Sequence, residues 1–145
     1  MWKDYLNSIS KECQFKAPAT TTDLLLIKTE LNVDLPKKLT DLYSETNGVY
    51  GNYGISFIWS TKQMVKDNMY FWNVQEHHRC STKPLNNFLF FSDAGNGDLF
   101  GYSIKNGSIQ TEDIYVWDHE GDSRKVVASS LEQFIKDWIG GKITI

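Results

Sequence analysis

The sequence contains few residues that stiffen or crosslink a chain: three prolines and two cysteines among 145 residues. Cys13 and Cys80 allow at most one disulfide bond, which excludes a small secreted domain stapled by several bridges. Two cysteines in a chain without an export signal are typical of free thiols in a reducing compartment. The cysteine content therefore predicts a cytoplasmic protein.

Long apolar runs are also absent. A membrane helix needs about 18 apolar residues, whereas the longest runs here are of the size of LLLI at 24–27 and FLFF at 88–91. The first ten residues, MWKDYLNSIS, include an acid at Asp4 and no apolar segment of the kind found in secretory signals. We therefore expect neither membrane association nor export.

An excess of basic residues is missing as well, because the net charge is −3. Nucleic-acid-binding domains usually present a basic face, so we expect no nucleic-acid partner. The segment 93–122 holds seven acids and a single lysine, and the rest of the chain is correspondingly three units positive. Such charge separation bears on the choice of partner rather than on the fold.

Apolar residues are plentiful enough, at 41% of the chain, for one packed domain over residues 1–145. Helical spacing of apolar residues predicts three helices in the first third, around Trp2–Ile9, Leu24–Leu31 and Leu39–Tyr43. We expect Thr21 or Thr22 to cap the second helix and Pro36 to lie in the first turn of the third. Asn47-Gly48 supplies a left-handed residue that ends it.

The middle of the chain changes period. GISFIWS at 54–60 has the composition of a strand. Ser60 or Thr61 is expected to cap a short helix that reaches Met69. Residues 73–87 show no clear period and are expected to form a loop.

The last third predicts a meander and a closing helix. FLFFS, LFGYSI and IYVWD are short apolar runs joined by turns such as Asn106-Gly107, and RKVVA is a candidate further strand. Ser130-Leu131-Glu132-Gln133 matches a capping box, and Gly140 ends the helix that follows. The predicted fold class is α+β, with an antiparallel sheet of about five to six strands and the N-terminal and C-terminal helices packed on it.

The loop in FFSDAGNGDLFGYSI, residues 90–104, combines acids with glycines. A calcium loop of the EF-hand type needs oxygen ligands at its third, fifth and twelfth positions, where this chain has Gly95, Gly97 and Ile104. A phosphate site would need a helix after the glycines, but a strand follows. Gly95 and Gly97 are better explained as positions with positive φ, and Gly101 as a bulge or a close backbone contact.

The segment EHHRC at 76–80 contains His77, His78 and Cys80, which can all bind zinc. Neighbours this close rarely complete one tetrahedral site, and no C-x-x-C pair accompanies them. No catalytic motif surrounds Cys80. Pairs from Asp98, Asp118 and Glu120 could serve glycoside hydrolysis, but any acidic domain offers such pairs. We therefore predict no catalytic residue, no metal site and no cofactor.

The segment IYVWDHEGDSRK at 114–125 leaves two alternatives open. Strand alternation sends Val116 and Trp117 to opposite faces of the sheet. If Val116 is buried, Trp117 is exposed among charged neighbours, which is the composition of a protein-binding hot spot. If Trp117 is in the core instead, Val116 lies outside and that anchor is absent.

Three segments carry a resemblance to a known family. LNVDLPKKLTDLYSETNG, FLFFSDAGNGDLFGYSI and IYVWDHEGDSRKVVASSLEQFIKDWI together resemble, in order, the helix pair, the strand–loop–strand hallmark and the closing strand, acidic loop and capped helix of the SUKH superfamily. This superfamily is named for the fungal Smi/Knr cell-wall regulators. The three segments cover about half of the chain.

The resemblance implies a non-enzymatic α+β domain, in bacteria typically an immunity protein that neutralises a polymorphic toxin. Combined with the charge pattern, it leads us to expect stoichiometric binding of a cognate toxin, a cationic nuclease domain, by a cytoplasmic monomer or weak homodimer. The expected contact residues are Asp93, Asn96, Asp98, Trp117, Asp118, His119, Glu120 and Asp122. The alternatives are a regulatory adaptor of the cell-wall type and a small metal-dependent hydrolase.

Overall fold

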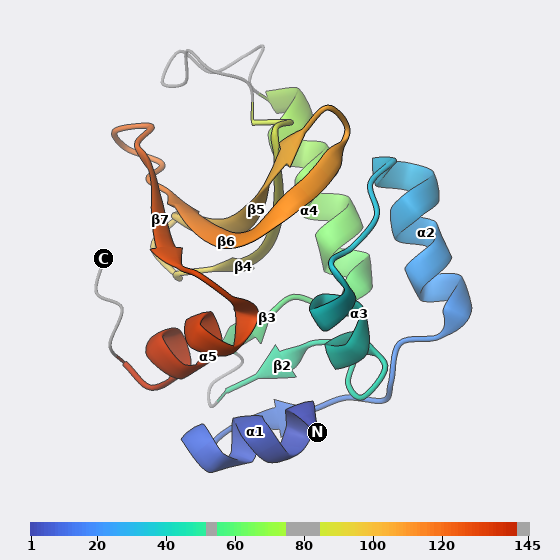
Figure 1. The fold of residues 1–145 in the computed structure, drawn as a ribbon, viewed down its shortest axis with the longest axis vertical. Coiled ribbons are helices and arrows are strands. Elements are labelled where there is room, and N and C mark those ends of the chain that lie inside the picture. The colour runs from blue at the N-terminus through green and yellow to red at the C-terminus, as the bar shows by residue number, and fades with distance from the viewer. Residues whose placement is uncertain (52–54, 75–84, 142–145) are drawn as a thin grey trace.

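Helices and short strands are interspersed in the first half of the chain, and four successive strands and a closing helix make up the second half (Figure 1). The structure is a computed structural model and describes residues 1–51, 55–74 and 85–141. Its elements are α1 (Trp2–Ile9), β1 (Gln14–Phe15), α2 (Thr21–Leu31), α3 (Lys37–Tyr43), β2 (Val49–Tyr50), β3 (Ser56–Ile58), α4 (Thr61–Val74), β4 (Phe88–Asp93), β5 (Leu99–Lys105), β6 (Ser108–Trp117), β7 (Arg124–Ala128) and α5 (Leu131–Ile139). The predicted α+β class is confirmed. Among the described residues, no helix has the length and apolar character needed to span a membrane.

The strands form two antiparallel sheets rather than a single one. A three-stranded sheet has the order β1-β2-β3, and the four-stranded sheet is the predicted meander, in the order β4-β5-β6-β7. The segment RKVVA is indeed its last strand. Asn106 and Gly107 join β5 to β6 with φ angles of 53° and 79°, as expected for a tight hairpin turn.

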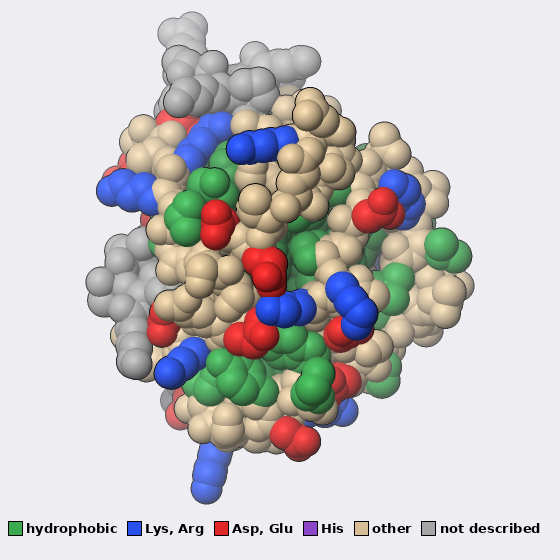
Figure 2. Space-filling view, in the orientation of Figure 1, with side chains coloured by type: hydrophobic (Ala, Val, Ile, Leu, Met, Phe, Trp, Pro, Cys, Tyr) green, Lys and Arg blue, Asp and Glu red, His purple; other side chains and the backbone are tan. Residues whose placement is uncertain are grey.

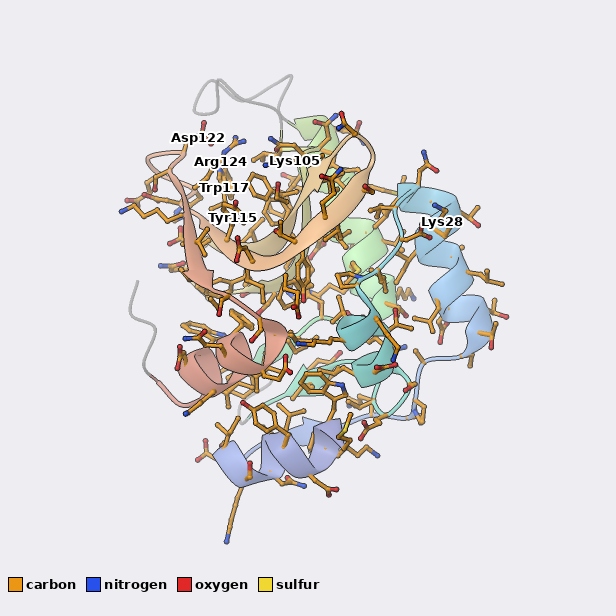
Figure 3. The ribbon with its side chains drawn as sticks, viewed as in Figure 1. Lys28, Lys105, Tyr115, Trp117, Asp122 and Arg124 are labelled. Atoms are coloured by element: carbon orange, nitrogen blue, oxygen red, sulfur yellow. The ribbon has the colours of Figure 1, made fainter. Side chains whose placement is uncertain are left out.

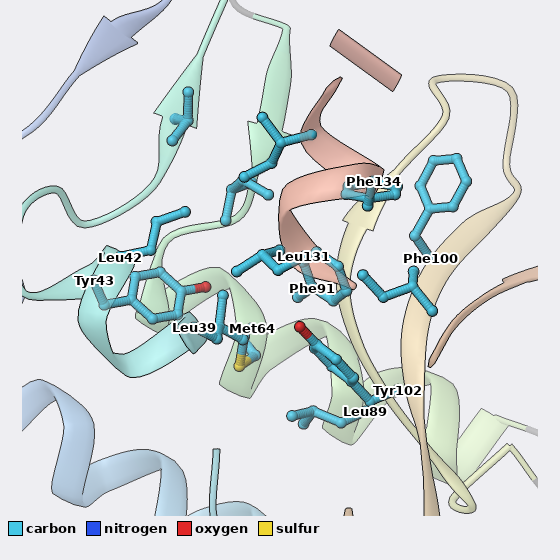
Figure 4. Packing of buried hydrophobic residues seen from close by; sticks show 14 of the residues in the cluster. Leu39, Leu42, Tyr43, Met64, Leu89, Phe91, Phe100, Tyr102, Leu131 and Phe134 are labelled. Carbon is cyan, nitrogen blue, oxygen red and sulfur yellow. The ribbon is translucent and has the colours of Figure 1, made fainter. Parts of the chain in front are cut away.

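The main core lies between the four-stranded sheet and helices α1, α2, α3 and α5, and Val49, Ile58 and Met64 add to it from β2, β3 and α4. Figure 4 shows part of it, with labelled residues from α3, α4, α5, β4 and β5. Phe134 of α5 is fully buried and meets Phe91 and Phe100 edge-on, with ring centroids 5.4 and 4.9 Å away. Burying one such ring contributes roughly 1.5–3 kcal/mol. The apolar face of the C-terminal helix therefore packs on the sheet, as the sequence predicted.

The opposite face of the four-stranded sheet is also buried. A second cluster, formed by Trp59, Leu85, Phe88, Phe90, Leu99 and Trp117, lies there, and Phe71, Trp72 and Tyr115 pack against it. Helix α4 brings Phe71 and Trp72 to this face. Because both faces of the sheet are covered, strand residues on either face can be core.

Helix α4 is longer than predicted, because it continues past Met69 to Val74. Ser60 caps it by accepting a hydrogen bond from the Gln63 N–H. The expected loop over 73–87 is therefore wrong at its start. The EHHRC segment lies outside the described residues.

The helix caps differ in detail from the prediction. Thr20, one residue before the expected caps, forms a full capping box with Asp23 on α2. At α5, Ser130 accepts from the Gln133 N–H. The Gln133 side chain, however, bonds the Ser129 hydroxyl instead of completing a box. Neighbouring serine hydroxyls can compete with the backbone N–H for the hydrogen bond of a capping side chain.

Glu45, which follows α3, anchors the start of α1. Its carboxylate accepts hydrogen bonds from the backbone N–H groups of Trp2 and Lys3, at 2.8 and 3.1 Å. The Trp2 bond is the main reason that the pKa of Glu45 falls to about 2. A lowered folded-state pKa gives stability that is present above the ordinary value and is lost as pH falls toward 2.

We therefore expect Glu45→Gln to cost about 2 kcal/mol at pH 7 and almost nothing near pH 2. Urea unfolding between pH 2 and 7 measures the difference. The matched control is Asp41→Asn, which removes an exposed carboxylate bonded to Lys37 and should cost less than about 0.5 kcal/mol. Equal losses for both variants, or a loss for Glu45→Gln that does not depend on pH, contradict the anchoring role.

Candidate functional site

Two loops that the sequence placed in the candidate site lie side by side at one end of the four-stranded sheet. They are residues 93–98, which run from the last residue of β4 to the start of β5, and residues 117–122, which run from the last residue of β6 toward β7. The pairing of Leu99 with both Asp93 and Trp117 sets them next to each other. Both occur on the side of the molecule where β7 runs (Figure 1).

His119 joins the two loops. Its backbone N–H donates to Oδ1 of Asp98 at 3.1 Å, and its ring Nδ1 lies 2.6 Å from the same oxygen. The ring packs on Gly97, where a Cβ atom would lie 2.9 Å from Nδ1. Gly97 has a φ of 106°, so the predicted positive-φ role is confirmed and glycine also makes room for the imidazole.

The contact shifts both groups toward their charged forms. Burial alone would raise the pKa of Asp98, but the side-chain and backbone hydrogen bonds from His119 outweigh it and lower the pKa. The hydrogen bond to Asp98 raises the pKa of His119 above its ordinary value, against a smaller effect of desolvation. Asp98 is therefore a carboxylate rather than an acid, and it holds an imidazole that gains a proton readily.

A shallow hollow of about 390 Å³ opens between the loops. Five of the predicted residues line it, namely Asn96, Asp98, Asp118, His119 and Glu120. The Glu120 side chain is 84% exposed, whereas Asp98 is buried beneath the surface. The structure thus brings these five predicted residues together as a rim with one buried carboxylate below it.

Trp117 is not an exposed anchor. It is 8% exposed and belongs to the second cluster, while Val116 belongs to the main core. The predicted alternation of the two residues is confirmed. Each of the two alternatives put one residue outside, and both are wrong on that point, because Val116 and Trp117 are buried on opposite faces of the sheet. Figure 3 shows Trp117 with Tyr115 and Arg124 inside the curve of the sheet.

Two predicted contact residues hold tryptophans in place. Oδ2 of Asp93 accepts a 2.7 Å hydrogen bond from the Trp59 indole. Oδ1 of Asp122 accepts from the Trp117 indole at 2.7 Å and from Arg124 at 3.1 Å. These carboxylates accept hydrogen bonds from buried donors. They therefore stabilise the interior of the domain more than they contribute to a binding surface.

The acids of segment 93–122 do not form one surface patch. Glu112 is paired with Lys38 at 2.7 Å, and the same lysine reaches Glu132 of α5 at 3.0 Å. In the view of Figure 2, acidic and basic side chains are interspersed. The expectation that these acids form a single surface region is therefore wrong for the segment as a whole. The acids that remain together at the surface are those at the rim of the hollow.

Asp98, Asp118 and His119 have potential metal-ligand atoms within 4.8 Å of one another. Oδ1 of Asp98 already accepts twice from His119, and Oδ1 of Asp118 accepts from the Glu120 N–H at 2.9 Å, so these oxygens already have hydrogen-bond partners within the loops. We assign no metal to them.

Sequence reasoning missed three residues of the hollow, Val116, Ser123 and Lys125. Val116 forms part of its lining, and Lys125 adds a cation from β7. The register Val116↔Lys125 puts both residues on one face. Strand alternation in RKVVA could have indicated Lys125, but only after β7 had been paired with β6.

The fold and this loop-built polar surface describe a small α+β domain whose candidate site offers charges and hydrogen-bonding groups around a shallow hollow. The family model SUKH_6, described as SMI1-KNR4 cell-wall, matches residues 22–135. The chain therefore belongs to this SUKH family, as the resemblance predicted, and the match runs from α2 into α5. Members are protein-binding modules of the Smi1-Knr4 or immunity type and are generally non-catalytic. No curated protein matches the chain.

Proposed function

We propose that this chain is an immunity protein that binds a cognate polymorphic toxin and neutralises it by stoichiometric occlusion. Membership of the SUKH family carries this proposal, and the candidate site is consistent with it. The rim formed by Asn96, Asp118, His119 and Glu120 is open to a protein, and a standard interface of about 800 Å² per partner covers far more than the hollow.

The toxin is proposed to present a cationic nuclease domain. Nucleases hold phosphate and are commonly basic on the face that does so. Asp118 and Glu120 lie on the outer surface with Asp98 beneath them, and charges within about 8 Å act together at physiological salt. The carboxylates at the rim would steer such a partner and fix its orientation. Asp93, Trp117 and Asp122 support this proposal only as the scaffold of the two loops.

The test of function is co-expression with the toxin encoded beside this chain. Growth should be rescued by the wild-type chain, and the two proteins should co-purify at a 1:1 ratio. Rescue without a stable complex contradicts occlusion. A stable complex without rescue supports instead the second candidate, a regulatory adaptor, which the description of the matching family as cell-wall proteins favours.

We expect the double variant Asp118→Asn/Glu120→Gln to slow association with the toxin about tenfold and to flatten its dependence on salt. The matched control is Glu12→Gln/Glu30→Gln, which changes the net charge equally at exposed acids outside both loops. Stopped-flow association at several salt concentrations distinguishes the two. An equal slowing in both variants means that total charge, and not the rim, guides the encounter.

A further inference from the structure

The contact of His119 with Asp98 directly joins the side chains of the two site loops. It consists of two hydrogen bonds to one carboxylate oxygen, from the backbone N–H and from the ring Nδ1. The ring also fills the space over Gly97. Movement of either loop away from the other must therefore break this contact.

Only the ring half of the contact depends on pH. An imidazolium donates a charge-assisted bond to the Asp98 carboxylate, and such bonds are roughly twice as strong as those between neutral groups. A neutral imidazole can keep at most a neutral donor at Nδ1. The backbone bond from His119 is the same in both states, so the loops stay joined, but less firmly, when the ring loses its proton.

The charged groups around the ring favour the imidazolium. Asp98 faces it from the β4–β5 loop, Glu120 lies 3.9 Å from Nε2, and Asp118 belongs to the same acidic turn. Lys125 of β7 is the opposing cation in the hollow. Three carboxylates against one ammonium leave the surroundings negative, and the side chain of His119 is 37% exposed, so protons reach it from solvent.

We propose that His119 is a pH-operated latch between the two site loops, closed firmly when its ring is protonated and held more loosely when the ring is neutral. The latch would regulate the same surface. Only its effect on binding a partner rests on the proposed function. The pH-dependent contact between His119 and Asp98 can be tested in this chain by itself. The experiment therefore uses the chain without a partner, so that a failure of the latch is distinct from a failure of the function.

The pH range follows from the direction of the shift. Because contact with Asp98 raises the pKa of His119 in the folded chain, the added stabilisation of the loops is complete below about pH 6.5 and is lost as pH rises through the folded-state value. The closed form therefore belongs to mildly acidic conditions.

Amide hydrogen exchange by NMR between pH 5.5 and 8.5 tests the latch. The probes are the N–H of His119 and the N–H of Ala94, which closes the other loop on Asp98. After correction for the intrinsic rate, we expect opening to increase about twofold to fivefold across this range, the effect of a partly exposed ion pair. In His119→Gln, which cannot titrate, opening should not change with pH.

The ring signal provides a second measurement. We expect the titration midpoint of His119 to lie above 6.5 in the wild-type chain and to fall in Asp98→Asn. The signal is assigned by its absence from His119→Gln. An unchanged midpoint in Asp98→Asn, or loop opening in the wild-type chain that does not vary with pH, overturns the proposal. A pH dependence that persists in His119→Gln overturns it as well.

Discussion

Replacement of Asn68 by alanine is expected to lower the free energy of unfolding by about 3–4 kcal/mol. Asn68 is fully buried in α4 and lies against the outer edge of β4. Its amide group donates to the Phe90 carbonyl and accepts from the Phe90 N–H, both at 2.8 Å. The side chain thus does for Phe90 what a neighbouring strand would do, and alanine leaves both backbone groups buried and unpaired.

The comparison with Asn73→Ala isolates this effect. Asn73 lies on the same helix and also donates to the carbonyl four residues before it, but it is exposed and, in the described part of the chain, bonds no strand. Its replacement should cost less than about 0.5 kcal/mol. Urea unfolding monitored by fluorescence measures both variants. Losses of similar size would show that the bonds to β4 contribute little.

The variant Asn68→Asp sharpens the test because it keeps the shape of the side chain. An ionised carboxylate can still accept from the Phe90 N–H, but it faces the carbonyl oxygens of Met64 and Phe90 in place of a donor. We expect a loss at least as large at pH 7. The loss should shrink as pH falls, because burial raises the pKa of such a group and the protonated form regains one donor.

This bond matters for the site because β4 runs directly into the loop 93–98. Helix α4 also bonds the edge of β4 through Trp72, whose indole donates to the Phe88 carbonyl at 2.8 Å. The edge strand is therefore covered by polar side chains of a helix, which removes an edge that could pair with another chain and fixes the strand that positions Asp93 and Asp98.

The elements with strong local signals were predictable from the sequence. Helical spacing placed α1 and α5 well, and the Asn106-Gly107 turn fixed the hairpin of β5 and β6. The bounds of α4 were missed because its last turn carries aromatic residues, Phe71 and Trp72, whose helical state depends on packing against the second cluster. The periodicity of a short sequence window cannot show that the helix will pack against this cluster.

The site was predictable as a pair of loops but not as a set of exposed charges. In a meander, alternate loops lie at the same end of the sheet, and residues 93–98 and 117–122 do so here because Leu99 pairs with both Asp93 and Trp117. The sequence could not show that Trp59 and Trp117 would each take a carboxylate from these loops. Counting acids treats every carboxylate as solvent-facing, whereas buried indole N–H groups need acceptors.

Replacement of Gly101 by alanine is expected to cost more than about 3 kcal/mol and to lower the melting temperature strongly. Gly101 lies in the middle of β5, paired with Phe90 on one side and Tyr115 on the other. A Cβ atom there would lie 2.5 Å from the Leu89 carbonyl oxygen and 3.0 Å from the Phe90 Cα. These are backbone atoms of the adjacent strand, so no side-chain rotation can relieve the clash.

The requirement at Gly101 is steric and not conformational, and Gly95→Ala separates the two causes. Gly95 has a φ of 85°, and a methyl group on its Cα would meet no atom within 4 Å, so alanine there should cost only the roughly 1–2 kcal/mol of left-handed backbone. Thermal unfolding by circular dichroism compares the variants. A loss at Gly101 no larger than that at Gly95 would mean that β4 and β5 can move apart to admit a methyl group. A larger loss would show that the four-stranded sheet needs the close approach of β4 and β5 at this position.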